Sequence, residues 1–346
     1  MAPFVHLHVH SQYSMLEGAI RVKDLCARVK DLGMSAVAVT DHGNMHGAIE
    51  FYQKATAAGV QPILGCELPF AFAMPGDKPD KHGRMRSYHL PVLARTAEGY
   101  KNLIALVSHA WLDPDGDPQS TLERLHDHRK GLVVLTGCLG GILPQSLLQH
   151  GPAYARQVMG QLREMVEPDG LFVELQEHGL VEQRIVNRIL ADMAREEGLP
   201  VVATNDCHYL RREDATAQRA LTCIASGSSL EESEATSHGS EEMYLKSPEE
   251  MAEAFADYPE ALENTARIAE MCKVKLDLGK PSLPKFRDEA GAVVNDVDEY
   301  FATLSRQGLE ERFEAFKRQG FAFDEARYRD RLETEVRVIQ GMKFPG

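Results

Sequence analysis

Short apolar runs alternate along the chain with longer stretches that have the periodicity of amphipathic helices. One such run, AVAVT at residues 36–40, is almost wholly apolar, as is typical of a strand buried on both faces. Alternating strands and helices predict an α/β fold with a parallel sheet, and seven such units favour a barrel over an open sheet, which stays possible. The seven runs lie at residues 4–9, 36–40, 61–64, 88–94, 132–136, 171–175 and 200–204.

The first run and the residue after it carry three histidines at alternate positions, within the sequence HLHVHSQYSMLEG. In a strand, this alternation places His6, His8 and His10 on one face. Neutral imidazole is a common ligand for zinc and other transition metals, and Glu17 could add an oxygen ligand after a turn. The alternative is a surface strand with exposed histidines. The recurrence of similar residues after later strands argues against it.

Residues able to bind a metal recur at the predicted strand ends as far as position 208. Five histidines, three carboxylates and one thiol are too many for a single tetrahedral ion. Such a mixed set predicts two or three divalent ions, with zinc, manganese or iron favoured over magnesium. Closely spaced ions suit the displacement of a phosphoryl group. The nine residues are His8, His10, Glu17, His42, Glu67, His89, Cys138, Asp206 and His208, of which Cys138 could instead be a small buried residue.

The charge and cysteine content of the chain narrow the range of functions. The 346 residues carry a formal net charge of −14, so any contact with nucleic acid must be local rather than spread over the surface. The six cysteines form no CxxC pair, and no apolar run approaches the length of a membrane span. These features predict a cytoplasmic chain with reduced thiols and no membrane association.

One segment departs from the acidic character of the chain. Residues 76–87 contain several basic side chains and lead directly into His89. A solvated loop is one interpretation. The other, which we favour, is a basic rim that guides a DNA backbone towards the metal site through Lys81, Arg84 and Arg86.

The C-terminal part of the chain has a different pattern. The sequence KPSLP at residues 280–284 interrupts the helical periodicity and predicts a linker. Two charged helical stretches follow, at about residues 296–317 and 324–340. Because this part contains too few strands for a domain, we expect one domain over residues 1–275, followed by a linker and the start of another region over 276–346.

Several of these motifs together carry a family resemblance. HLHVHSQYSMLEGA, AVTDHGNMHGAIEFY, ILGCE and Asp206-x-His208 resemble the polymerase and histidinol phosphatase (PHP) superfamily. The closer resemblance is to the N-terminal PHP domains of bacterial DNA polymerase III alpha subunits. It implies a distorted (β/α)7 barrel, the PHP fold, which holds up to three metals on the nine residues given above. One departure is Glu17, where related sequences often carry Asp.

The resemblance also implies a function. Family members with all nine ligands resemble metal-dependent 3′–5′ exonucleases that proofread DNA, whereas polymerase activity would require the full-length chain. Residues 276–346 resemble the entry to the polymerase palm, and the implied partners are a DNA 3′ end and other replisome subunits. The alternatives are a structural module stabilised by its metals, or a small-molecule phosphatase of the histidinol phosphatase type.

Individual roles follow from the same resemblance. Asp206, His208 and His10 are the expected catalytic residues. His6 and Asp41 are expected behind the ligands, although Asp41 could instead cap the following helix. Glu174 and His178 follow a strand near the site, and either could touch substrate.

Overall fold

The computed structural model describes residues 4–79, 85–112, 118–231, 240–279 and 284–345. The chain divides into two compact units, Met1–Leu276 and Asp277–Gly346. All nine predicted metal ligands lie in the first unit. Among the described residues, no helix is both long enough and apolar enough to cross a membrane.

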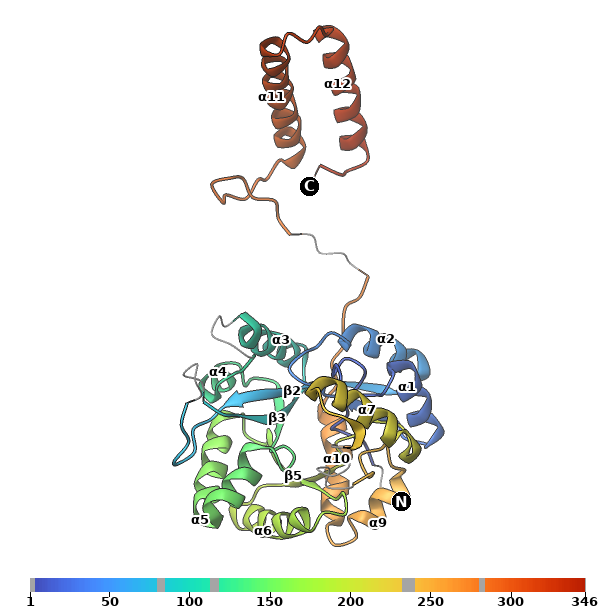
Figure 1. The fold of residues 1–346 in the computed structure, drawn as a ribbon, viewed down its shortest axis with the longest axis vertical. Coiled ribbons are helices and arrows are strands. Elements are labelled where there is room, and N and C mark those ends of the chain that lie inside the picture. Colours follow the sequence, from blue (N-terminus) through green and yellow to red (C-terminus); the bar gives the residue numbers. More distant parts are fainter. Residues whose placement is uncertain (1–3, 80–84, 113–117, 232–239, 280–283, 346) are drawn as a thin grey trace. The chain divides into compact units, whose positions relative to one another are not determined.

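The first unit is built around a curled six-stranded sheet with helices on its outside, which forms a half-barrel (Figure 1). Its strands follow one another in sequence order. They are β1 (Ala36–Val39), β2 (Gln61–Ala71), β3 (Ser87–Ala94), β4 (Leu132–Leu135), β5 (Leu171–Gln176) and β6 (Val201–Thr204).

The expectation of a wholly parallel sheet is wrong for one strand. β1–β2, β4–β5 and β5–β6 are parallel pairs, but β3 runs antiparallel to both of its neighbours. The 15 residues between β2 and β3 contain no described helix, so the chain turns back instead of crossing over the sheet. β3 therefore begins at the edge of the sheet where its neighbours end.

The first predicted strand is an extended segment in which only Val9 forms a bridge, with Cys207. Its backbone forms hydrogen bonds to β1 on one side and to the residues after β6 on the other. On one side, the amide of Ala38 in β1 donates to the His6 carbonyl over 2.8 Å. On the other side, Cys207 just after β6 exchanges hydrogen bonds with His8 and His10 over 3.0 and 2.8 Å. Residues 4–10 thus connect the first and last strands of the sheet.

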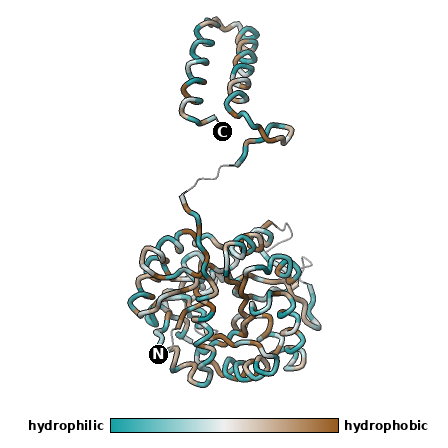
Figure 2. Tube along the Cα trace, turned by 180° about the vertical axis from the view of Figure 1, so that it is seen from behind, coloured by the Kyte–Doolittle hydropathy of each residue, from teal (hydrophilic) through white to brown (hydrophobic). Residues whose placement is uncertain are grey.

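Apolar side chains are buried on both faces of the strands, as the AVAVT run predicted. Val37 and Val39 of β1 belong to the larger cluster, which includes residues of the outer helices. Ala36 and Ala38 belong to a second cluster, in which side chains from all six strands pack with the helix α10 (Pro259–Met271). Figure 2 shows the resulting hydrophobic interior and the more hydrophilic outside.

Three helix ends carry local sequence signals. Gly59 and Gly198 end two helices with φ of +75° and +67°, a left-handed conformation that glycine adopts without strain. Ser247 begins another with a capping box to Glu250. Besides α10, the described helices of the first unit are α1 (Val22–Asp31), α2 (Ala48–Ala58), α3 (Ala97–Leu112), α4 (Leu122–Asp127), α5 (Ile142–Met165), α6 (Val181–Glu197), the short 3-10 helix η1 (Arg212–Asp214), α7 (Ala215–Ser226) and α9 (Pro248–Ala254).

The second unit contains the two predicted helices, α11 (Val297–Arg318) and α12 (Glu325–Gly341). They pack through an aromatic cluster in which Phe313 of α11 meets Tyr328 of α12 edge to face, with ring centroids 6.1 Å apart. An ion pair between Arg306 and Glu333, with a nitrogen–oxygen distance of 2.8 Å, also links them. A pair this exposed contributes little to stability, so the aromatic contacts are the main link.

Candidate metal centre

The predicted ligands converge at one edge of the half-barrel. His8 and His10 come from the extended N-terminal segment, His42 follows β1, and Asp206 and His208 follow β6. The antiparallel β3 delivers His89 near its start to this same edge. Its register places Pro69 of β2 opposite His89, so that Glu67, two residues earlier in β2, faces the same side.

Asp206 lies at the middle of the cluster. Its Oδ1 atom is 3.4 Å from His8 Nε2, 3.1 Å from His10 Nε2 and 3.2 Å from His208 Nε2. Glu67 reaches the same histidines from the other side, with Oε1 3.4 Å from His8 Nε2 and Oε2 3.7 Å from His10 Nε2. Among the described residues, three sets of side chains could each hold an ion: His10, His42 and His208; His8, His10 and Asp206; and His42, Glu67 and His89.

The central atoms of this cluster fit a cation. Among the described residues, the buried atoms His8 Nε2, His10 Nε2, Glu67 Oε2 and Asp206 Oδ1 lie close together but form no hydrogen bond of normal geometry, although Glu67 Oε2 also lies 2.6 Å from His42 Nδ1. Buried polar atoms are rarely left this way, because each costs free energy unless something satisfies it. Ligand atoms about 2.1 Å from a tetrahedral zinc ion lie roughly 3.4 Å from one another. The separations between 3.1 and 3.7 Å measured here match that spacing.

The hydrogen bonds of three histidines leave the correct nitrogen free for an ion. His8 Nδ1 contacts the Glu174 carboxylate at 2.7 Å, and His208 Nδ1 contacts the Glu17 carbonyl at 3.2 Å. Both partners can only accept, so both Nδ1 atoms must donate. His10 Nδ1 contacts the Ser14 hydroxyl at 3.0 Å. In each case Nε2 remains as the atom that faces the cluster.

The hydroxyl of Ser14 is oriented by the predicted supporting residue Asp41. Ser14 Oγ donates to Asp41 Oδ1 over 2.8 Å, so its oxygen accepts the proton on His10 Nδ1. The Ser11 amide donates to the same carboxylate over 2.6 Å. Asp41 therefore orients a candidate ligand through Ser14. It does not cap the next helix, whose N-cap residue is Gly47.

Glu67, Asp206 and His10 are held in the charge states that bind metals. Burial opposes ionisation of the Glu67 carboxyl, but His42 and His8 hold its pKa well below its usual range. Burial likewise opposes ionisation of Asp206, but His8 and a second imidazole hold its pKa well below the usual range. Burial lowers the pKa of His10 far below normal, and two neighbouring imidazoles reinforce this. Ionised carboxylates and neutral imidazole are the forms that coordinate ions. Burial opposes protonation of His8, but Asp206, Glu174 and Glu67 raise its pKa well above normal, which shows that these carboxylates favour a positive charge beside them.

The backbone of Asp206 has an uncommon conformation. Its φ is +42°, in the left-handed region that few residues other than glycine, Asn and Asp adopt. Asn205, just before it, is held at both ends of its side-chain amide. Nδ2 donates to the carbonyls of Glu242 and Tyr244, and Oδ1 accepts from the buried Lys246 ammonium over 3.1 Å. These bonds hold the turn that aims Asp206 into the cluster.

The outer part of the cluster is more exposed. His42 links two carboxylates, with Nδ1 2.6 Å from Glu67 Oε2 and Nε2 2.7 Å from Glu17 Oε2. Burial would lower the pKa of His42, but Glu67 and Glu17 raise it to about 10, which shows how strongly this place favours positive charge. His89 Nδ1 lies 3.7 Å from Glu67 Oε2.

Cys138 lies beside the cluster but in none of the three sets. Burial raises the pKa of its thiol well above normal, and the Asp206 and Glu67 carboxylates raise it further. Its Sγ atom accepts a hydrogen bond from the Gly140 amide over 3.4 Å. Its role as a ligand stays a prediction.

The sequence pattern groups His6 with His8 and His10, but its imidazole contacts Lys246 and Cys207 and belongs to none of the three candidate sets. Its Nε2 atom contacts the Lys246 carbonyl at 2.9 Å, and its Nδ1 atom contacts Cys207 Sγ at 3.5 Å. Burial lowers its pKa to about 4, although the hydrogen bond to Lys246 opposes this. His6 is thus a neutral buried residue that supports the segment carrying Asp206.

Sequence reasoning missed the role of Glu174. This carboxylate is buried and accepts hydrogen bonds from His8 Nδ1, the Thr204 hydroxyl, Gln176 Nε2 and, over 2.9 Å, the Gly137 amide. It therefore holds a candidate ligand and the loop that leads to Cys138. The Glu174–His8 contact joins residues 166 positions apart, so no local sequence pattern could predict it.

Glu174→Gln is expected to weaken metal binding by about 10- to 100-fold, because an amide has one acceptor oxygen and no charge with which to hold His8. Metal affinity can be measured by competition with a chromogenic chelator, with circular dichroism as the check on folding. Glu177→Gln is the matched control, since Glu177 bonds to Arg184 rather than to a ligand. Equal affinities for Glu174→Gln and wild type would show that Glu174 is only structural.

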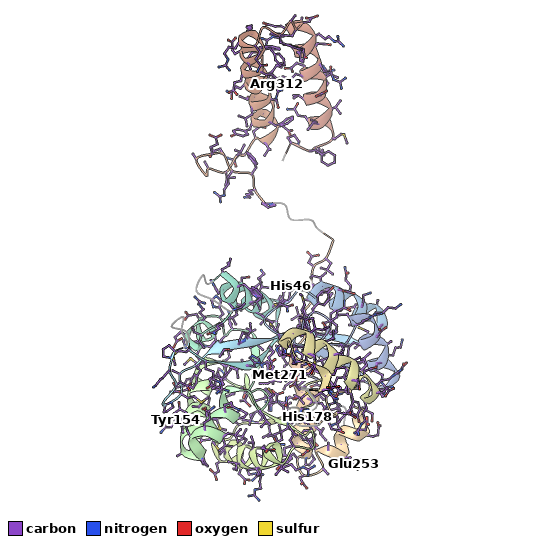
Figure 3. The ribbon with its side chains drawn as sticks, viewed as in Figure 1. His46, Tyr154, His178, Glu253, Met271 and Arg312 are labelled. Carbon is purple, nitrogen blue, oxygen red and sulfur yellow. The ribbon has the colours of Figure 1, made fainter. Side chains whose placement is uncertain are left out.

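Other predicted residues lie outside the cluster or outside the described residues. His178 is buried, with its imidazole bonded to Gln183 and to the Asn205 carbonyl, so it is not placed to touch substrate. The Arg86 guanidinium lies 5.2 Å from the centre of the Tyr88 ring. Lys81 and Arg84 fall outside the described residues. His46, the next histidine in the chain after His42, is exposed and was not among the predicted residues (Figure 3).

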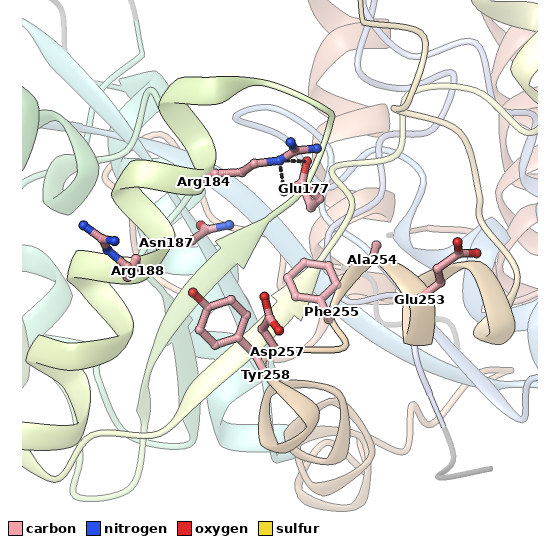
Figure 4. A pocket seen from close by; sticks show the side chains of 9 residues that line it. All are labelled: Glu177, Arg184, Asn187, Arg188, Glu253, Ala254, Phe255, Asp257 and Tyr258. Atoms are coloured by element: carbon pink, nitrogen blue, oxygen red, sulfur yellow. Dashed lines mark hydrogen bonds and ion pairs between the residues drawn. The ribbon is translucent and has the colours of Figure 1, made fainter.

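A cavity of about 510 Å³ opens beside α6 (Figure 4). Arg184 in its wall is paired with Glu177, and Tyr258 and Phe255 line it from the α9–α10 region. The described residues that line it include none of the nine candidate ligands. It is therefore separate from the metal cluster.

Comparison with known proteins finds relatives that match nearly the whole chain. The DNA polymerase III alpha subunit of Helicobacter pylori is 38% identical over 99% of this chain and 30% of its own length. That of Borreliella burgdorferi is 39% identical over 99% of this chain and 29% of its own length. The chain is thus homologous to these subunits and spans about 30% of their length.

A solved two-domain protein from Bacteroides vulgatus, which contains a predicted PHP-like metal-dependent phosphoesterase, aligns with a TM-score of 0.39 and 14% identity. The alignment covers 76% of this chain and 63% of that one. The family model of the PHP domain matches residues 6–178. Because this match covers half of the chain, the chain belongs to the PHP domain family.

Proposed function

We propose that the first unit is a metal-dependent phosphoesterase, and that it acts as a 3′–5′ exonuclease on DNA. The observation that carries this proposal is the group of four buried atoms, on His8, His10, Glu67 and Asp206, that lie close together and, among the described residues, form no hydrogen bond of normal geometry. Their spacing suits a cation, and further ligands surround them. A cluster of cations is suited to a substrate whose reacting group is a phosphodiester.

We propose that the nine residues hold two or three divalent ions of zinc, manganese or iron. When bound, these ions would neutralise negative charge on the attacking and leaving oxygens of the phosphodiester. The side chains of the protein position the ligand atoms that would hold these ions. Asp206, His10 and His208 place their ligand atoms around one point, and Glu174 and Asp41 keep the histidine tautomers that leave Nε2 available.

The organisation of the whole chain is also a proposal. Residues 1–275 would form the PHP domain, a distorted (β/α)7 barrel if the extended residues 4–10 are counted as the seventh strand. Residues 276–346 would form a linker and the start of a polymerase palm. The relatives are about three times longer, so polymerase activity and contacts with other replisome subunits in the cytoplasm would belong to a full-length protein.

Arg86 remains a candidate for guiding a DNA 3′ end, together with Lys81 and Arg84. The described part of this segment leads through Tyr88 to His89, whose imidazole belongs to one of the three candidate sets. Basic side chains here would attract a phosphate backbone to an otherwise acidic chain.

Metal analysis joined to a nuclease assay tests the proposal. The purified chain should contain two or three transition-metal ions and should shorten a 3′-labelled single strand from its labelled end. Hydrolysis of a phosphomonoester without attack on DNA would support a small-molecule phosphatase instead. A metal-loaded chain that is inactive on both substrates would support a purely structural role.

A further inference from the structure

The single tryptophan of the chain is exposed beside the metal cluster. Trp111 lies at the end of α3, and 58% of its surface is accessible. Its indole Nε1 donates a hydrogen bond to the Gly43 carbonyl over 2.6 Å. Tryptophan is usually highly buried. An exposed ring whose position is fixed by a hydrogen bond from its N–H group therefore indicates a surface that binds a ligand.

The residue that holds this ring adjoins a candidate ligand. Gly43 follows His42, and the Gly43 amide donates to the Glu67 carbonyl over 2.8 Å. Both backbone groups of Gly43 are thus engaged, one with Trp111 and one with the strand that carries Glu67. The indole ring is therefore anchored one residue away from the cluster.

A second apolar surface lies on the loop that carries Glu17. Met15 is 75% exposed and Leu16 is 42% exposed, and Leu16 has a φ of +67°, which is strained for a leucine. Glu17, the next residue, contacts His42 Nε2. His42 thus contacts Glu17 of this loop, and its neighbour Gly43 contacts Trp111. Exposed apolar side chains therefore adjoin the cluster on both segments.

We propose that Trp111 is a stacking platform for a nucleobase of a single strand whose end occupies the metal cluster. This inference rests on the proposed function and narrows its substrate class. A flat, exposed indole matches the face of any base, and such stacking is largely independent of sequence. Because the chain is acidic overall, backbone attraction alone would bind a strand weakly, and stacking adds affinity that does not depend on salt.

Because Trp111 is the only tryptophan, its fluorescence reports on this site alone. The probe is a short single strand with phosphorothioate linkages at its 3′ end, which slow hydrolysis. This strand should quench the fluorescence, whereas the same strand with abasic 3′-terminal positions, or inorganic phosphate, should not. Unchanged fluorescence with the intact strand would overturn the inference without any variant being made.

Variants measure the contribution of the ring to affinity, by anisotropy of a labelled strand. Trp111→Ala should bind roughly five- to hundredfold more weakly, with the same dependence of log affinity on log salt concentration. Trp111→Phe should retain part of the affinity. Leu112→Ala, next to it and 78% exposed, is the matched control and should bind like wild type. Wild-type affinity in Trp111→Ala would overturn the inference.

The outcome separates this inference from the proposed function. If the strand quenches the fluorescence but is not hydrolysed with any metal, the stacking site is supported and the exonuclease activity is refuted. If the strand is hydrolysed without quenching, and Trp111→Ala does not change KM, the exonuclease activity is supported and the stacking site is refuted. Melting temperatures of the variants confirm that each is folded.

Discussion

Asp206→Asn is expected to lower the rate of phosphoester hydrolysis by roughly a hundredfold or more while leaving the fold intact. The amide has nearly the shape of the carboxylate, but it has no charge and is a poor bridging ligand. Asp206 Oδ1 lies within 3.4 Å of three histidine nitrogens, so its loss affects all of them. Asn also tolerates the φ of +42° at this position, so the turn should survive.

The measurement is degradation of a 3′-labelled single strand with manganese and with zinc, with metal content determined on the same samples. Asp169→Asn is a matched control, because Asp169 also has a positive φ of +63° and is exposed. Its rate should equal that of wild type. If Asp206→Asn also keeps the wild-type rate, the activity comes from another site or a contaminant.

Removal of the metals is expected to lower the melting temperature of the first unit. The candidate ligands come from the N-terminal segment, β2, β3 and the residues after β1 and β6, so ions would join parts that are distant in sequence. An ion that binds only the folded state, at a free concentration a hundredfold above its Kd, adds about 2.7 kcal/mol of stability. For a unit of this size, that corresponds to about 5–10 °C.

Thermal unfolding followed by circular dichroism, before and after treatment with chelator, measures this shift. The same chelator saturated with zinc beforehand controls for effects of the reagent itself, and metal added back should restore the melting temperature. An unchanged melting temperature, after mass analysis has confirmed that the metal is gone, would refute metal stabilisation of the fold.

Much of the candidate site was visible in the sequence because its residues sit in local patterns. His8 and His10 alternate within an apolar segment, and Asp206 and His208 follow a largely apolar run. Residues directly after buried strands tend to meet at one edge of an α/β fold, so strand prediction was sufficient to group them. The structure brings these residues together, with Asp206 among the histidines.

The direction of β3 could not be inferred in this way. An apolar run looks the same whether its strand is parallel or antiparallel, and direction depends on the connection that precedes it. His89 was grouped with the strand ends, although it lies near the start of β3. It reaches the cluster because the antiparallel direction brings the start of that strand to the same edge.

By itself, the sequence determined which side chains can bind metal and which segments are buried strands and capped helices, because these properties depend on neighbouring residues. Only the tertiary structure decided how those side chains are supported. Glu174 holds His8, Asp41 acts on His10 through Ser14, and Trp111 is anchored at Gly43. The physical reason is that Glu174–His8 and Trp111–Gly43 join residues 166 and 68 positions apart, and no periodicity in the chain records such distant contacts.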